Sequence, residues 1–340
     1  MNARAKAVRT DAELQCPHLD AGLRARGVDL VLLPDGVAEA DLARAVADAD
    51  LLLMCYTPVT ARVIEAAPRL RGIVKYGVGI DAIDIDAARA RGVPVVNVPE
   101  YAERTVAEGA FLLLLALAKK LAPMHEAMRR DGWIWPSTPW LGSDIAGKTL
   151  GLVGVGRIGR SMAQMAGAGF GAHVLGFDPH VSAIQMRDAG VDKRERLHAM
   201  LAECDFVSLH CVLDASTRGL IGEAEFAAMK PGAMLINVSR GALIDEQALL
   251  RALDSGHLGS AGLDVYAREP LARTGHPLSG LFHRDNVILL PHLTFFTREA
   301  MQRLEEETLQ RCDELLAGAP VRVKSRDPRL TAQRHGVRFD

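Results

Sequence analysis

The sequence carries little net charge. Its 40 Lys and Arg residues nearly balance 42 Asp and Glu residues, so the formal net charge over 340 residues is −2. Nucleic-acid affinity rests on clustered Lys and Arg side chains that release counterions from phosphates. The composition therefore gives no reason to expect a nucleic-acid partner.

Paired cysteine spacing is also absent. The five cysteines are scattered, odd in number and free of any CxxC pattern. Neither a disulfide framework nor a metal site is indicated, and the cytoplasm is the expected compartment. The cysteines are Cys16, Cys55, Cys204, Cys211 and Cys312.

Long apolar runs are missing as well. The first 15 residues include basic side chains but no apolar stretch of signal-peptide length. The most apolar segment, GAFLLLLALA at residues 109–118, ends at Lys119 and Lys120 and is too short to span a bilayer. We expect a buried helix there and no membrane partner.

What the chain does contain is an alternation of short apolar runs with helical patterns. Runs rich in Val, Ile and Leu that alternate with helices indicate βαβ units and parallel sheets, so the fold class is α/β. Residues 131–148 interrupt the alternation, which predicts two sheets, the second starting at about Thr149. The expected strands are residues 28–33, 50–55, 72–76, 93–98, 150–156, 173–178, 205–210, 233–238, 262–266 and 286–291.

Two further segments carry expectations of their own. Residues 105–130 form one long helical pattern between the two sheets. The tail from Val321 is rich in arginine and poor in apolar residues, so it is expected to be solvated, frayed or draped over another subunit. A functional role for this basic tail stays open.

A glycine-rich turn opens the second sheet. Gly154, Gly156 and Gly159 form GxGxxG directly after an apolar strand and before a helical pattern, as in sites that hold a pyrophosphate on free N–H groups. Asp178 ends the next strand, where a carboxylate can accept hydrogen bonds from a ribose 2′-hydroxyl and would repel a 2′-phosphate. The pattern favours NAD over NADP. The competing reading is a tight turn followed by a surface aspartate.

Three titratable or charged residues follow later strands. Arg240, Glu269 and His292 should lie beyond the carboxyl ends of parallel strands, where ligands bind. Arginine matches a carboxylate and polarises a carbonyl, histidine exchanges a proton near neutral pH, and a glutamate orients the imidazole. Each residue alone also fits a structural role. Together they fit the reduction of a 2-oxo acid.

The sequence resembles the D-isomer-specific 2-hydroxyacid dehydrogenases over roughly residues 50–300. The resemblance implies a flavodoxin-like substrate-binding domain at residues 1–101 and 292–340, a Rossmann NAD-binding domain at residues 102–291, and a cleft between them. It also implies a homodimer with the helix after Thr105 in the contact. The motifs are KYGVGID, VPVVNVP, TVAEGAF, GKTLGLVGVGRIG, INVSRGALID, GLDVYAREP and LLPH.

Carried over to this chain, the resemblance makes Arg240, Glu269 and His292 the catalytic residues. Val78 and Gly79 match the loop that holds the substrate carboxylate, with Lys75, where arginine is common, either close to that carboxylate or facing solvent. The run at residues 210–213 also departs from the family by lacking a proline. The residues implied in cofactor binding are Thr105, Gly154, Gly156, Arg157, Ile158, Gly159, Asp178, Cys211, Thr217, Val238 and Asp264, with Asp264 near the nicotinamide amide.

The substrate is the least determined feature. Phe295 and Phe296 follow the histidine where many relatives carry small residues, and with Tyr101 they resemble the D-lactate dehydrogenase branch and indicate a narrow apolar pocket. The phenylalanines could equally pack the hinge. Other candidates are an NAD(H)-binding corepressor-like protein and relatives specific for 3-phosphoglycerate, hydroxypyruvate or phosphite. The direction of the reaction stays open.

Overall fold

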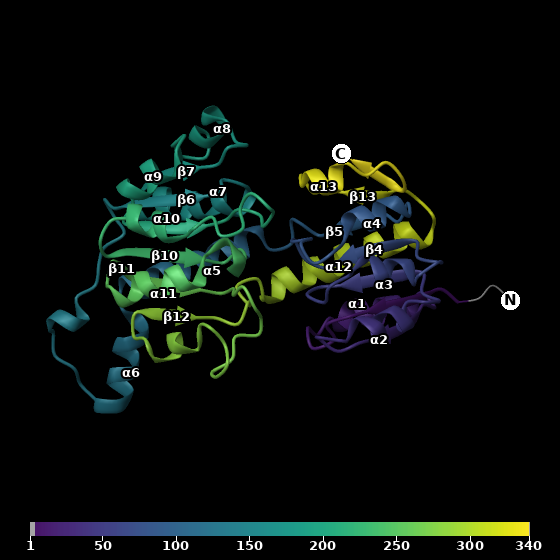
Figure 1. The fold of residues 1–340 in the computed structure, drawn as a ribbon, viewed down its shortest axis with the longest axis horizontal. Helices are drawn as coiled ribbons and strands as arrows, with labels where there is room; N and C mark the ends of the chain where they lie inside the picture. Colours follow the sequence, from purple (N-terminus) through teal and green to yellow (C-terminus); the bar gives the residue numbers. More distant parts are fainter. Residues whose placement is uncertain (1–3, 340) are drawn as a thin grey trace. The chain divides into compact units, whose positions relative to one another are not determined.

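The computed structural model describes residues 4–339, which divide into two compact units. Unit 1 comprises the chain up to Ala102 and from Thr297 onward, and unit 2 comprises Glu103–Phe296 (Figure 1). The return to unit 1 comes five residues later than the boundary expected at residue 292. The reason is local: the N–H groups of Leu293 and Thr294 donate to Asp264, which holds them in unit 2.

Unit 1 is built on a five-stranded parallel sheet in the order β2-β1-β3-β4-β5, the flavodoxin-like order. Strand β1 is not among the strands predicted from the sequence. This strand, KAVR, is short, and half of its residues are basic. Arg9 is nevertheless buried, because it pairs with Asp20 at 2.8 Å. The strands are β1 Lys6–Arg9, β2 Asp29–Leu32, β3 Leu51–Met54, β4 Gly72–Lys75 and β5 Val95–Asn97.

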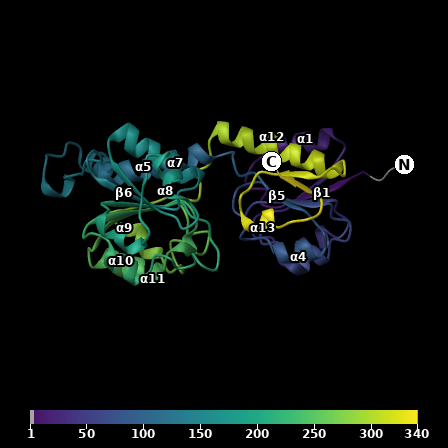
Figure 2. The ribbon, with the colours of Figure 1, turned by 90° about the horizontal axis from the view of Figure 1, so that it is seen from above.

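Helices cover both faces of this sheet (Figure 2). The long α12 packs against α1 and β4 on one face, while α4 lies on the other, next to α3. Sequence-distant segments thus form one unit. The helices are α1 Pro17–Ala25, α2 Glu39–Ala45, α3 Ala61–Glu65, α4 Ile85–Ala90 and α12 Arg298–Leu316.

The Arg-rich tail is folded onto unit 1, so the expectation of a frayed segment is wrong. Strands β13 Val321–Val323 and β14 Val337–Phe339 pair in parallel around α13 Pro328–Thr331. The buried amide of Gln333 accepts from the Val95 N–H at 2.7 Å and donates to the Val95 carbonyl at 2.9 Å. The tail therefore completes the hydrogen bonding of β5.

Unit 2 contains a seven-stranded parallel sheet in the order β12-β11-β10-β9-β6-β7-β8. The order reverses at β6 and β9, as in doubly wound dinucleotide-binding folds, and β6 begins at Thr149 as expected. The predicted strand 262–266 begins earlier, at Leu258. The strands are β6 Thr149–Val153, β7 His173–Phe177, β8 Asp192–Lys193, β9 Phe206–Leu209, β10 Ala233–Asn237, β11 Leu258–Leu263 and β12 Val287–Leu289.

The expected long helix at 105–130 is two helices, because Lys120 adopts a left-handed backbone with φ of 52°. In Figure 2, α5 and α7 lie on one face of the sheet, and α9, α10 and α11 lie on the other. The α-helices are α5 Glu103–Ala118, α6 Leu121–Asp131, α7 Arg157–Ala163, α8 Ala183–Arg187, α9 Leu197–Glu203, α10 Glu223–Ala228 and α11 Glu246–Asp254. Other helical segments are η1 Thr138–Trp140, η2 Gln164–Gly169, η3 Gly241–Leu243 and η4 Ser279–His283.

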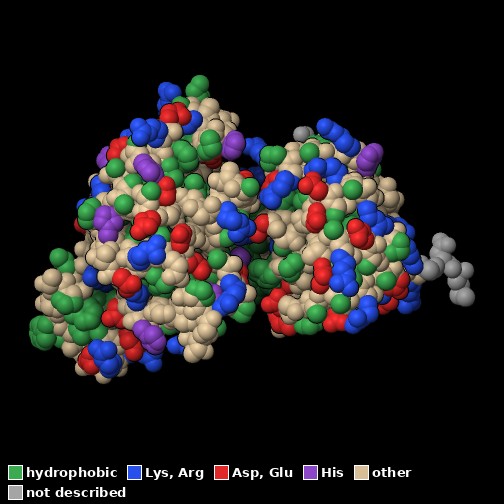
Figure 3. Space-filling model, in the orientation of Figure 1, with side chains coloured by type: hydrophobic (Ala, Val, Ile, Leu, Met, Phe, Trp, Pro, Cys, Tyr) green, Lys and Arg blue, Asp and Glu red, His purple; other side chains and the backbone are tan. Residues whose placement is uncertain are grey.

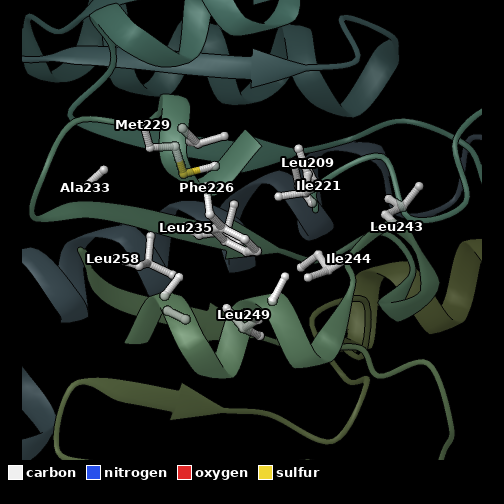
Figure 4. Close-up of a cluster of buried hydrophobic side chains, with 14 of the residues drawn as sticks. Leu209, Ile221, Phe226, Met229, Ala233, Leu235, Leu243, Ile244, Leu249 and Leu258 are labelled. Atoms are coloured by element: carbon white, nitrogen blue, oxygen red, sulfur yellow. The ribbon is translucent and has the colours of Figure 1, made fainter. Parts of the chain in front are cut away.

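A large hydrophobic core of unit 2 lies between the sheet and the helices α10 and α11. Figure 4 shows Phe226 of α10 and Leu249 of α11 pointing toward Leu235 of β10. Such burial stabilises the sheet by roughly 25 cal/mol per Å² of apolar surface. Between residues 4 and 339, no helix combines the length and apolarity needed to cross a membrane.

Candidate active site

The glycine-rich turn connects β6 to α7. Gly154 has a φ of 93°, and a Cβ there would lie 2.7 Å from the backbone nitrogen of Cys211. A Cβ at Gly159 would lie 2.4 Å from the Gly154 carbonyl oxygen. Only glycine permits these backbone approaches, which bring the turn against the end of β9.

The middle glycine faces open space. A Cβ on Gly156, the residue that precedes α7, would meet no atom within 4 Å, so a ligand can approach the backbone closely. Arg157 adds a guanidinium, which pairs with Glu103 at 2.9 Å, and Ile158 follows it in the first turn. Open backbone at a helix start suits a pyrophosphate.

Asp178 stands directly after β7 and beside this turn. Its carboxylate accepts the N–H of Val155 at 3.0 Å and the N–H of His180 at 2.9 Å. The acid is thereby held next to the glycine-rich turn. Together, the open glycine and the adjacent carboxylate fit a dinucleotide such as NAD.

The other cofactor candidates lie around the same sheet edge or on α5. Burial raises the pKa of the Cys211 thiol to about 12, so this side chain after β9 is uncharged at neutral pH. Thr217 steadies the same loop by donating to the Val212 carbonyl at 2.7 Å. Val238 follows β10, and Thr105 lies in the first turn of α5; both are buried.

Glu269 and His292 form a direct pair. The Nδ1 atom of His292 lies 2.8 Å from Oε2 of Glu269, and the Tyr266 N–H donates to Oε1 of the same carboxylate at 3.0 Å. Burial tends to raise the pKa of Glu269, but the hydrogen bond and charge of His292, the Tyr266 N–H and the charge of Arg240 outweigh it. The pKa of Glu269 is therefore lowered, and the carboxylate is ionised at neutral pH.

Arg240 is brought toward this pair by its own loop. Its carbonyl accepts from the Asn237 side chain at 2.9 Å, and its Nη1 donates to the Ser239 carbonyl at 2.8 Å. The next residue, Gly241, lies against the loop of Glu269, because a Cβ there would be 1.9 Å from the Tyr266 carbonyl carbon. The three residues predicted from separate strand ends thus meet in unit 2.

His292 has an unusual backbone, with φ of 59°. The two residues that follow are tied to fully buried Asp264, which accepts the N–H of Leu293 at 2.9 Å, the N–H of Thr294 at 3.0 Å and its hydroxyl at 2.6 Å. The sequence predicts Asp264 near the nicotinamide but does not reveal this role. No local pattern shows that a strand-end aspartate accepts from a loop 29 residues later.

Unit 1 holds most of the residues predicted to bind substrate. Val78 is exposed, Gly79 is half-buried, and the Asn97 side chain donates to the Val78 carbonyl at 2.6 Å. Buried Tyr101 accepts from Arg303 Nε through its carbonyl at 2.8 Å. In unit 2, Phe295 is buried with its ring centroid 6.5 Å from that of His292, whereas Phe296 is 48% exposed.

Lys75 is 4% exposed, so the reading of a solvent-facing lysine is wrong. Its ammonium donates to the Cys55 carbonyl and lies 5.5 Å from the centre of the Tyr56 ring. Asp11 is not among the residues predicted from the sequence, yet its buried carboxylate accepts the N–H groups of Cys55 and Thr57 at 2.7 and 3.1 Å. Lys75 and Asp11 together fix the loop after β3.

Among residues 4–339 there is no group of three or more His, Cys, Asp or Glu side chains placed to hold an ion. The site combines the glycine-rich turn with the Arg, Glu and His set at the carboxyl ends of parallel strands.

Comparison with known proteins shows the family. Residues 111–294 match the model of the D-isomer specific 2-hydroxyacid dehydrogenase, NAD binding domain. The chain is 39% identical over 264 residues to glyoxylate reductase of Korarchaeum cryptofilum, which covers 77% of this chain and 78% of that protein. The chain belongs to the D-isomer specific 2-hydroxyacid dehydrogenase family and carries its NAD-binding domain.

Two further relatives show how far the likeness extends. D-3-phosphoglycerate dehydrogenase of Mycobacterium leprae is 40% identical over 285 residues, covering 84% of this chain, but the chain spans only 52% of that protein. The structure of D-lactate dehydrogenase from Aquifex aeolicus with NAD and lactic acid superimposes with a TM-score of 0.81 at 29% identity, over 92% of this chain and 96% of that one. The two-unit α/β fold expected from the sequence is confirmed.

Proposed function

We propose that this protein interconverts a D-2-hydroxy acid and its 2-oxo acid with NAD. The observation that carries the proposal is the 2.8 Å contact between His292 Nδ1 and Glu269 Oε2 in a unit that also holds the glycine-rich turn. A carboxylate on Nδ1 sets the imidazole tautomer and leaves Nε2 as the atom that exchanges a proton with the substrate oxygen.

The residues divide the work of carbonyl reduction. Bound NADH would supply a hydride to the carbonyl carbon. The imidazolium form of His292 gives a proton to the carbonyl oxygen and the neutral imidazole takes it back in the reverse direction, while ionised Glu269 stabilises the imidazolium form. Arg240 aligns the substrate carboxylate with its planar fork of donors and polarises the carbonyl.

Unit 1 is proposed to bind the acid end of the substrate. The backbone N–H groups of Val78 and Gly79 would hold the carboxylate, as the motif KYGVGID indicates. Lys75 is proposed to act by holding the loop after β3 through the Cys55 carbonyl rather than as a mobile surface cation.

NAD is proposed over NADP because Asp178 stands beside the turn. Replacing Asp178 with Ala should reduce the ratio of kcat/KM for NADH to that for NADPH by about tenfold or more, since one lost ionic or hydrogen-bonding contact is worth about 1.5–3 kcal/mol. Asp188→Ala, in the loop after α8, is the matched control. An unchanged ratio in Asp178→Ala would remove this residue from coenzyme selection.

Two substrate classes remain in competition. A small 2-oxo acid with an apolar side chain is favoured by Phe296, whose exposed ring follows the histidine by four positions. The 40% identity to a protein named D-3-phosphoglycerate dehydrogenase favours a phosphorylated acid. We favour the small apolar acid, because an aromatic ring near the histidine offers a phosphate group no cationic partner.

Steady-state rates of NADH oxidation test the reaction and the substrate class together. The panel comprises pyruvate, phenylpyruvate, glyoxylate, hydroxypyruvate and 3-phosphohydroxypyruvate, and the reverse direction is measured with both lactate isomers. We expect the highest kcat/KM with an unphosphorylated acid. Preference for the phosphorylated acid would overturn the substrate class, and tight NADH binding without turnover of any acid would favour a regulatory, corepressor-like protein.

A homodimer and a cytoplasmic location are further parts of the proposal. Large apolar side chains gather on the segment around α6, at the lower left of Figure 3. Exposed apolar side chains that cluster in this way mark interfaces, and a second copy of the chain is the proposed partner. The exposed apolar residues of this segment are Leu121, Met128, Trp133, Trp135 and Leu141.

The five free cysteines fit a reducing compartment, which supports the proposed cytoplasmic location.

A further inference from the structure

The loop between β11 and η4 carries Glu269. Each of the three residues before Glu269 makes a hydrogen bond that holds the loop. The Tyr266 N–H donates to Glu269 itself, and the Ala267 N–H donates to Oε1 of Glu246 at 2.8 Å. The carbonyl of Arg268 lies 2.9 Å from Nε2 of His276. The residue immediately before Glu269 is therefore tied to a histidine eight positions away.

His276 is 5% exposed, and its two ring nitrogens have different partners. Nδ1 accepts the Leu278 N–H at 3.0 Å, so it carries no proton. Nε2 faces the Arg268 carbonyl, which only accepts, so Nε2 carries the proton. The two partners thus require the neutral Nε2–H tautomer, and this imidazole acts as a fixed bridge between the two ends of the loop.

The same loop is closed by further bonds around His276. The Arg268 guanidinium donates to the Gly275 carbonyl at 2.7 Å. The His276 N–H donates to the Ser279 hydroxyl at 3.1 Å, and that hydroxyl donates to the Ala272 carbonyl at 2.9 Å. These bonds fix the backbone around His276. Its Nε2 atom contacts the carbonyl of Arg268, the residue before Glu269.

We propose that His276 is a positioning residue that holds Glu269 against His292 by fixing the Arg268 carbonyl. The inference rests on the proposed function, because it matters for turnover only where the Glu269 and His292 pair exchanges the substrate proton. A peptide shift at Arg268 would move the carboxylate, whose 2.8 Å contact with Nδ1 orients the imidazole. His276 itself does not touch the reacting atoms.

Two substitutions of His276 each remove one of its two hydrogen bonds and keep the other. In His276→Gln the side-chain amide occupies the place of Nε2 and still donates to Arg268, but the Leu278 N–H loses its acceptor. In His276→Asn the side-chain oxygen occupies the place of Nδ1 and still accepts from Leu278, but the reach to Arg268 is lost. Each variant loses one hydrogen bond, so a purely structural role predicts similar loss of stability and similar activity in both.

We expect His276→Asn to lower kcat about 10- to 100-fold, as loss of a partner that orients a functional side chain does, with KM and NADH affinity little changed. His276→Gln should stay within about threefold of wild type. The substitutions are repeated in a Glu269→Gln background, where His276→Asn should have no further effect on kcat. Equal kcat in the Asn and Gln variants, or the same loss in the Glu269→Gln background, would overturn the proposal.

A measurement without turnover keeps this proposal distinct from the proposed function. The ¹⁵N and ¹H shifts of the His292 ring report its contact with Glu269 in the coenzyme-free protein. They should change in His276→Asn and stay as in wild type in His276→Gln. Unchanged shifts in both variants would refute the positioning role. If the shifts change as expected while wild type reduces none of the 2-oxo acids, the proposed function alone fails.

Discussion

His292 occupies a left-handed backbone conformation that residues other than glycine rarely adopt, with φ of 59°. The strained conformation is held from both sides, by the ring contact to Glu269 and by the bonds that Leu293 and Thr294 make to Asp264. Strain that neighbouring contacts maintain in this way is typical of a residue whose side chain must point in one direction.

The first prediction concerns the side chain of His292. His292→Ala should lower kcat about 10²- to 10⁴-fold, the usual contribution of a general acid–base group, while NADH affinity changes little because the imidazole is not needed to hold the dinucleotide. Stopped-flow or steady-state rates and fluorescence titration with NADH measure the two quantities. His173→Ala, an exposed histidine at the start of β7, is the control. Full turnover in His292→Ala would exclude the assignment.

The second prediction follows from the lowered pKa of Glu269. A carboxyl group with a pKa below its ordinary value of 4.5 stabilises the folded state at pH values above 4.5, and this contribution disappears as the pH falls through the folded-state pKa. The free energy of unfolding of wild type minus that of Glu269→Gln should therefore decrease as the pH falls below 4.5. Urea titrations at several pH values measure it, and an increasing difference would contradict the ionised assignment.

At the scale of elements, the site depends on how closely the loops after β10 and β11 approach each other. Arg240 ends one loop and Glu269 lies in the other, and Gly241 is the point of contact. A Cβ at Gly241 would lie 1.9 Å from the carbonyl carbon of Tyr266, so the backbones themselves must separate to admit it.

The third prediction is that Gly241→Ala destabilises the protein by about 1–3 kcal/mol, the usual cost of overpacking, and also lowers kcat by displacing the neighbouring Arg240. Gly280→Ala is the matched control, because a Cβ there would meet no atom within 4 Å. Denaturant unfolding and steady-state rates are measured on both variants. Wild-type stability and activity in Gly241→Ala would show that the two loops do not need this contact.

Two elements differ from their sequence patterns for identifiable reasons. The apolar periodicity of residues 105–130 continues across Lys120, and only the backbone at that residue separates α5 from α6. The arginine-rich tail resembles a solvated segment by composition, but Gln333 and β13–β14 pairing fold it onto unit 1. The first feature depends on one backbone conformation and the second on contacts between distant residues, and neither is encoded in composition or periodicity.

At the scale of the whole molecule, the apolar side chains around α6 bear on assembly. Trp133 and Trp135 are 72% and 76% exposed, with ring centroids 6.2 Å apart. Burying such a pair between two copies would provide interface anchors of about 2 kcal/mol or more each.

The fourth prediction is that Trp133→Ser combined with Trp135→Ser shifts the protein from dimer to monomer. Each copy would lose two anchors, so association should weaken by at least about 100-fold. Light scattering coupled to size exclusion gives the mass, and Ile184→Ser, an equally exposed apolar residue on α8, is the control. A wild-type mass equal to one chain would refute the dimer, and an unchanged dimer in the double variant would place the interface elsewhere.

The sequence alone determined the α/β class, the start of the second sheet at Thr149, the glycine-rich turn and the three residues Arg240, Glu269 and His292. These features are local: strand periodicity, glycine spacing and residue type are properties of short segments, and parallel strands bring their carboxyl ends to one edge.

The contacts that hold these residues in place follow only from the tertiary structure. The hydrogen bond from the Leu293 N–H to Asp264, the approach of Gly241 to Tyr266, the bridge from His276 to Arg268 and the bond from Lys75 to the Cys55 carbonyl each join separate positions of the chain. Short β1 was missed for the same reason, because the buried partner of Arg9 lies on another element. Hydrogen bonds and packing between distant residues depend on the folded backbone, and no local pattern specifies them.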